Sequence, residues 1–163
     1  MNNSHIKNLF SNGPFDIDKE SDRYFQYALF DEIKFHYENN ELYKNYLIKK
    51  NFLMNEHKTN FLNEIPYVSV QIFKELGSVL SSVQKSDIKT SLHSSATSGK
   101  PSKILVDKET SRRQIKAMVK VLGDFIGNSR RKFHIMDVSP ENVDSLEIGA
   151  RMAAARGFLN FSS

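Results

Sequence analysis

The first third of the chain carries apolar residues at the spacing of amphipathic helices. One set recurs every four positions: Phe25, Leu29, Ile33 and Tyr37. A second set follows the polar pair Asn39-Asn40: Tyr43, Tyr46 and Leu47. Because residues four apart share one face of a helix, the pattern predicts two helices with a break at the asparagines. We expect these faces to form core and assign them no chemistry.

The segment that follows is polar between Asn51 and Asn63 and then turns apolar. Ile65-Pro66 restricts the backbone, since the residue before a proline avoids the helical region. The run Tyr67–Leu76 behind it favours a short helix that Gly77 closes. Residues 1–87 are therefore predicted to be a helical lead-in.

From Ile88 onward, short β-prone runs alternate with helical patterns. The predicted strands are Ile88–His93, Lys103–Asp107 and Phe133–Val138. Such alternation is typical of an α/β layer with crossover helices. We therefore predict an α/β fold in which residues 88–163 form a partial mixed sheet, whose unpaired edge would favour a homo-oligomer.

The best-defined helix lies between the second and third predicted strands. Its apolar residues fall on one face: Ile115, Met118, Val119, Leu122 and Ile126. Asp107, or Ser111 with Gln114 three residues later, fits an N-terminal cap, and Gly127-Asn128 fits the end. After Ser139-Pro140, a helix of small residues is predicted over Ala150–Arg156, with Gly157 as its end.

Composition narrows the function classes. The 163 residues suffice for one ordinary domain, and 23 basic against 19 acidic residues give a net charge of only +4. The basic residues lack interleaved aromatics, so nucleic-acid binding is not expected. The absence of cysteine excludes disulfides, thiolate metal sites and a cysteine nucleophile, and favours the cytoplasm. No apolar stretch approaches the roughly 18 residues of a membrane span.

The candidate chemistry lies in the loop between the first two predicted strands. Residues 94–102 run Ser-Ser-Ala-Thr-Ser-Gly-Lys-Pro-Ser. Small hydroxyl residues and glycine let backbone N–H and side-chain O–H groups approach phosphate oxygens, because no bulky side chain blocks them. Lys100 adds a mobile positive charge, and Pro101 stiffens the exit. A solvated turn between two strands is the alternative explanation.

The nearest rival motif is the Walker A loop. It requires glycine five residues before Gly-Lys and a hydroxyl residue directly after the lysine. Ser94 and Pro101 occupy those two positions, so the Walker A interpretation fails.

The loop instead resembles the phosphate loop of the adenylate-forming ligases. That family pattern is Ser/Thr-Ser-Gly-Ser/Thr-Thr-Gly-x-Pro followed by Lys, Ser or Thr. Ser98 keeps a hydroxyl at the threonine position, and Ala96, in place of glycine, is the one departure in kind. The chain is most similar to the acyl-protein synthetases, or long-chain-fatty-acid luciferin-component ligases, and to phenylacetate–coenzyme A ligases. Beyond Ser102 at the loop end, the similarity lies in Ile65-Pro66, in the strand Phe133–Pro140 with its Asp-x-Ser-Pro end, and in the run from Ala153 to Phe161. It covers residues 20–163.

The resemblance implies an ATP-dependent ligase that activates a carboxylic acid, in this family a fatty acid, as an acyl adenylate. The acyl group then passes to a thiol of a protein or of coenzyme A, with Mg²⁺ sharing the phosphate charge. The implied ATP-binding residues are Ser94, Ser95, Thr97, Ser98, Gly99, Lys100 and Ser102. No catalytic residue and no metal ligand is identified.

The decisive later motifs of these ligases are missing from residues 1–163. The ribose-binding aspartate, the mobile C-terminal domain and the acyl-accepting cysteine would all lie downstream. We therefore expect a single incomplete N-terminal part of a ligase domain, made by truncation or by natural shortening. A non-catalytic interaction or regulatory module on the same fold is the alternative, and Ala96 and the missing cysteine favour it.

Three further features carry less weight as ligand contacts. His93 ends the first predicted strand, where an ordinary packed histidine is the more frequent case. Asp137 precedes Ser-Pro and fits a turn as well as a ligand crevice. Arg130-Arg131-Lys132 is best explained as a solvated basic turn.

Overall fold

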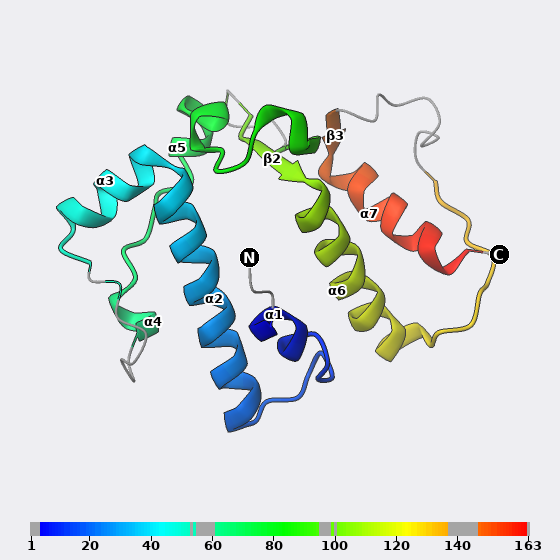
Figure 1. Ribbon diagram of the computed structural model, residues 1–163. Helices are drawn as coiled ribbons and strands as arrows, with labels where there is room; N and C mark the ends of the chain where they lie inside the picture. Colours follow the sequence, from blue (N-terminus) through cyan, green and yellow to red (C-terminus); the bar gives the residue numbers. More distant parts are fainter. Residues whose placement is uncertain are drawn as a thin grey trace. The chain divides into compact units, whose positions relative to one another are not determined.

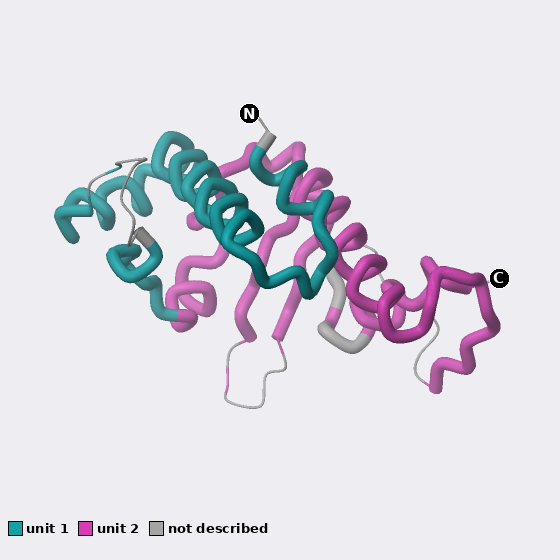
Figure 2. Tube along the Cα trace, turned by 90° about the horizontal axis from the view of Figure 1, so that it is seen from below, with its two compact units in different colours: residues 1–69 teal, residues 70–163 magenta. Residues whose placement is uncertain are grey.

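The computed structural model describes residues 4–52, 54, 61–94, 99, 101–136 and 147–162. The chain divides into two compact units, residues 1–69 and 70–163 (Figure 2). The predicted start of the α/β segment at residue 88 coincides with the first residue of strand β1. That the two units form a single incomplete ligase domain stays a prediction.

Unit 1 is helical in the part of it that the structure describes. Its helices are α1 (Ser4–Leu9), α2 (Lys19–Asn39), α3 (Glu41–Lys49) and α4 (Phe61–Glu64) (Figure 1). The two predicted helices correspond to α2 and α3. Asp18 caps α2 by accepting a hydrogen bond from the Ser21 backbone N–H at 2.7 Å, which lowers the pKa of the Asp18 carboxyl.

Asn40 forms the whole junction between α2 and α3. Its backbone N–H donates to the carbonyl oxygen of His36 at 2.9 Å and so ends α2. Its side-chain oxygen accepts from the backbone N–H of Tyr43, also at 2.9 Å, and so caps α3. Only 6% of Asn40 is exposed, hence these polar groups are satisfied inside the protein rather than by water. The predicted break at the asparagines is confirmed.

The core of unit 1 forms where α2 and α3 meet. Phe30, Ile33 and Leu47 are buried at its centre. Around them pack partly buried side chains: Leu29, Tyr37, Tyr43, Tyr46, Phe52, Met54 and Ile65. Phe25 was predicted to share the core face of α2, but 45% of it is exposed. Phe25 lies about one helical turn before Leu29. Leu29 is the first residue of the predicted face that packs in this cluster.

Unit 2 contains the sheet. It begins with α5 (Ile72–Glu75) and the short 3₁₀ helices η1 (Gly77–Leu80) and η2 (Lys85–Asp87). The strands are β1 (Ile88–His93), β2 (Lys103–Asp107) and β3 (Glu147–Gly149), in the order β2-β1-β3. β1 pairs antiparallel with β2 and parallel with β3, so the predicted α/β fold with a mixed sheet is confirmed. The remaining elements are α6 (Lys108–Ile126), α7 (Ala150–Phe158) and η4 (Leu159–Phe161).

The predicted helix over Tyr67–Leu76 is much shorter in the structure. Only Ile72–Glu75 are helical, and Gly77 opens the 3₁₀ helix η1 instead of closing a helix. A Cβ added at Gly77 would lie 3.0 Å from the carbonyl oxygen of Lys103. The glycine therefore lets η1 approach the edge of β2, a tertiary contact that outweighs the local helical pattern.

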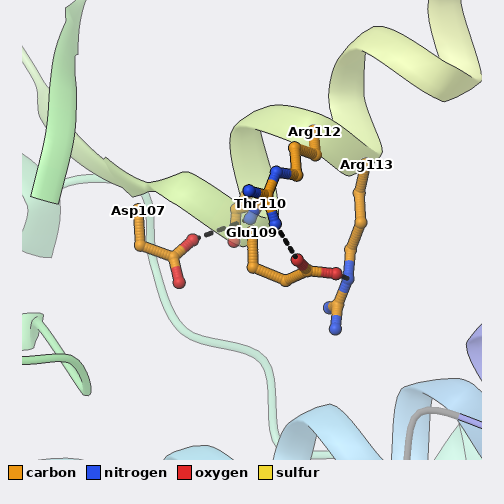
Figure 3. A network of polar contacts seen from close by, with 5 residues as sticks. All are labelled: Asp107, Glu109, Thr110, Arg112 and Arg113. Atoms are coloured by element: carbon orange, nitrogen blue, oxygen red, sulfur yellow. Dashed lines mark hydrogen bonds and ion pairs between the residues drawn. The ribbon is translucent and has the colours of Figure 1, made fainter. Parts of the chain in front are cut away.

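Helix α6 has the boundaries that its sequence predicted. Of the two proposed caps, Asp107 is the one used, since its side chain accepts from the Thr110 backbone N–H at 2.8 Å. Gly127, at φ +73°, ends the helix. In the first turn Glu109 lies within 3.5 Å of both Arg112 and Arg113 (Figure 3).

The predicted strand Phe133–Val138 is not found among the residues described. Phe133–Met136 have no strand partner, and Asp137-Val138 lie outside the described residues. Instead the chain makes an isolated parallel bridge between Arg131 and Ser162, and the rings of Phe133 and Phe158 lie 5.7 Å apart. The segment therefore packs its aromatic side chain against the C-terminal helix, although its β-prone composition favoured a ladder.

Gly157 was predicted to end the last helix, but α7 continues through it to Phe158. The side chain of Met118 on α6 occupies the place where a Cβ of Gly157 would stand. Gly157 is thus a site of close helix contact, and the helix ends one residue later. No helix in the described part of the chain is long and apolar enough to cross a membrane.

We predict that Asn40→Ala destabilises unit 1 by about 1–2 kcal/mol, because it removes the α3 cap inside the protein. Amide hydrogen exchange at Tyr43 should accelerate, and the urea midpoint followed by circular dichroism should fall. Asn40→Asp keeps the side-chain acceptor and is the matched control. Unchanged Tyr43 exchange in Asn40→Ala would show that the cap carries no stability.

Candidate functional site

The predicted phosphate loop connects β1 and β2 as the turn of a hairpin. His93, the last residue of β1, pairs with Lys103, the first residue of β2. The predicted strand–loop–strand unit is thus confirmed. Ser94, Gly99 and Ser102 are described; the other predicted binding residues, Ser95, Thr97, Ser98 and Lys100, lie outside the described residues, as does Ala96.

The two ends of the loop are fastened to each other by Ser94 and Ser102. The Ser94 backbone N–H donates to the carbonyl oxygen of Ser102 at 3.2 Å. In return the Ser102 backbone N–H donates to Oγ of Ser94 at 2.9 Å. A side-chain oxygen thus replaces the backbone carbonyl that a regular antiparallel ladder would use.

The hydrogen bonds that close the loop satisfy buried backbone groups of Ser102. Ser102 is only 5% exposed, so its N–H needs a partner within the protein. Pro101 before it has no N–H, so Ser102 carries the first backbone donor after the proline, at the end of the loop that leads into β2. Ser94 and Ser102 are both predicted phosphate contacts, and that role stays a prediction. In the structure they set the distance between the loop ends.

Gly99 has the one conformation in the described part of the loop that requires glycine. Its φ is +107°, in a region that L side chains rarely adopt. A Cβ built there would meet nothing within 4 Å. The requirement therefore comes from the backbone conformation and not from crowding, and the exposed backbone at Gly99 is accessible to a ligand.

His93 at the base of the loop is joined to Ser91. The Ser91 Oγ lies 2.9 Å from the His93 Nε2, and Ser91 is 5% exposed. Residues two apart along a strand point to the same face, so the pair lies on one side of the sheet. His93 was a candidate contact from the sequence, whereas Ser91 was not. The i, i+2 spacing of a hydroxyl and an imidazole at the end of a predicted strand was the available signal.

The opposite face of β1 belongs to the core. Leu92 packs against the buried residues Met152 and Ala155 of α7. Helix α7 thus closes one side of the sheet, and the side chains of Ser91 and His93 lie on the other. The parallel strands β1 and β3 end at His93 and Gly149, and the carboxyl ends of strands are where open α/β sheets bind ligands.

The basic turn after α6 is tied to the end of the chain. The Arg130 guanidinium donates to the carbonyl oxygen of Ser162 at 2.7 Å. The Arg131 backbone N–H donates to the carbonyl oxygen of Phe161 at 2.9 Å. These bonds give both arginines a structural role in fixing the C-terminal segment.

Metal ligation has no visible basis in the described residues. No group of three or more histidine, aspartate or glutamate side chains there is placed to hold a metal ion. We therefore assign no residue of this part of the chain to Mg²⁺.

Comparison with known proteins agrees with the resemblance found in the loop and its flanks. A family model described as "Acyl-protein synthetase, LuxE" matches residues 1–163. Neither the curated proteins nor the solved structures give a significant match. The match extends over the whole chain, beyond the loop itself, and confirms the predicted similarity to acyl-protein synthetases. The chain belongs to the acyl-protein synthetase family LuxE.

Proposed function

We propose that this chain supplies the ATP phosphate-binding loop of an acyl-protein synthetase. The observation that carries the proposal is the clasped hairpin, in which Ser94 and Ser102 close a loop that contains Gly99 at positive φ. Membership of the family supports the same reaction class, because acyl-protein synthesis requires an activated acyl group.

The loop acts by positioning and by charge. Backbone N–H groups and small hydroxyls surround phosphate oxygens, and the Lys100 ammonium adds a charge-assisted contact to the β- and γ-phosphates. The proposed contacts are Ser94, Ser95, Thr97, Ser98, Gly99, Lys100 and Ser102. Because the ends of the loop are fixed at Ser94 and Ser102, less ordering is needed when the phosphate binds.

In the first step a carboxylate oxygen of the acyl substrate attacks the α-phosphorus of ATP. The bond from that phosphorus to the oxygen bridging to the β-phosphate breaks, and pyrophosphate leaves with the electron pair. The product is an acyl adenylate. The loop stabilises the charge that develops on the leaving pyrophosphate, and no residue of this chain is assigned a proton transfer.

In the second step a thiolate attacks the acyl carbon, a thioester forms and AMP leaves. This chain contains no cysteine, so the thiol belongs to coenzyme A or to a polypeptide segment outside residues 1–163. By the resemblance, the acyl group is that of a fatty acid. Mg²⁺ would enter on the phosphate oxygens of ATP and neutralise part of their charge.

A non-catalytic module built on the same fold is the second candidate. Ala96 favours it, because a methyl group in place of the family's glycine restricts the backbone next to the phosphate. The two candidates differ in ATP binding. A module that has lost the chemistry would bind no ATP or would bind it independently of Lys100.

We predict that Lys100→Ala weakens ATP binding by about tenfold or more, since it removes a charge-assisted contact to phosphate. Isothermal titration calorimetry at fixed salt measures the change. Lys100→Arg keeps the charge and should lose less affinity. Equal ATP affinity in the wild type and Lys100→Ala would contradict this role of the loop.

We also predict that Ala96→Gly tightens ATP binding by about fivefold. Glycine reaches positive φ without the cost of about 1 kcal/mol that alanine incurs there. The same titration with Ala96→Ser, which restores no glycine, is the control. A weaker affinity in Ala96→Gly would show that the loop binds phosphate with an ordinary backbone at this position, or not at all.

A further inference from the structure

Three residues from three strands form one row at the base of the loop. His93 at the end of β1 pairs with Lys103 on β2 and with Gly149 on β3. Paired residues of neighbouring strands point to the same face of a sheet. Lys103 and His93 therefore share a face, and at the third position Gly149 presents no side chain.

The imidazole in this row is held from within the protein. Oγ of Ser91 lies 2.9 Å from Nε2 of His93, and Ser91 is 5% exposed. The tautomer of the imidazole decides which of the two groups donates. In either case the buried hydroxyl orients the ring, while His93 itself is half-buried at the strand end that leads into the loop.

Gly149 leaves room beside that ring. A Cβ at this position would meet nothing within 4 Å among the described atoms, and its φ of −73° suits any residue. Neither backbone conformation nor crowding thus requires glycine in the free protein. Because neighbouring strands lie about 4.8 Å apart, the vacant position is next to His93.

We propose that the row Lys103, His93 and Gly149 is a phosphate-contacting surface beneath the loop. Nε2 of His93 accepts from the Ser91 hydroxyl, so the imidazole carries its proton on Nδ1 and donates from there to a phosphate oxygen of the bound ATP. Lys103 adds positive charge, and Gly149 keeps the space that the phosphate occupies. The inference rests on the proposed ATP-binding function and extends the site from the loop to the sheet.

The first test compares His93→Phe with His93→Asn by calorimetric titration with ATP. Phenylalanine keeps the ring and removes the donor, so ATP binding should weaken by about fivefold, the effect of one hydrogen bond. Asparagine keeps an N–H donor near the position of Nδ1 and should lose less affinity than phenylalanine. Ser91→Ala should weaken binding in the same direction as His93→Phe, because the imidazole loses its anchor.

The second test fills the vacant position with side chains of different volume. Gly149→Ala and Gly149→Val are a matched pair, since neither side chain caps α7 and both tolerate the observed backbone. Valine should weaken ATP binding by about fivefold or more and alanine by less, while both variants keep thermal midpoints close to each other.

The outcomes separate this inference from the proposed function. If the wild type binds ATP in a Lys100-dependent manner and both His93→Phe and Gly149→Val bind it equally well, the row is not a phosphate contact and the loop function stands. If the wild type binds no ATP, both fail. If His93→Phe does not fold, the Gly149 pair decides, because its side chains enter open space.

Discussion

Strand β1 is paired along both of its edges, and the organisation of unit 2 depends on this. Its antiparallel pairing with β2 creates the hairpin, and its parallel pairing with β3 brings α7 onto the sheet. Leu92 seals one face against Met152 and Ala155, which leaves Ser91 and His93 on the other face. One strand of six residues thus separates a face packed against α7 from the face that carries Ser91 and His93, at the point where the candidate loop begins.

Elements specified by local signals were predictable from sequence. Asp107 caps the start of α6 and Gly127, at positive φ, ends it. Asn40, with an extended backbone, separates α2 from α3 by capping α3 with its side chain. These signals act within one turn of helix, so no knowledge of tertiary structure is needed. The strands on both sides of the loop were likewise found from composition and spacing.

Features specified by distant contacts were not predictable. Phe133 lies in a β-prone segment but packs against Phe158. Gly157 has the local signal of a helix end, but it lies inside α7, where the side chain of Met118 packs against it. The alignment of His93 with Gly149 depends on a register between strands far apart in sequence, which no local pattern contains. For the same reason local patterns predict the loop residues but not the alignment of His93 with Lys103 and Gly149.

The parallel pairing of β1 with β3 also orders the events of folding. The hairpin joins residues 93 and 103, whereas the row is completed only when residue 149 reaches the sheet. Closing the shorter loop costs less chain entropy, so we expect the hairpin to form first during synthesis and the β3 edge to dock later. A nascent chain that ends before β3 would therefore display the candidate loop on a two-stranded hairpin, with no Gly149 beside His93.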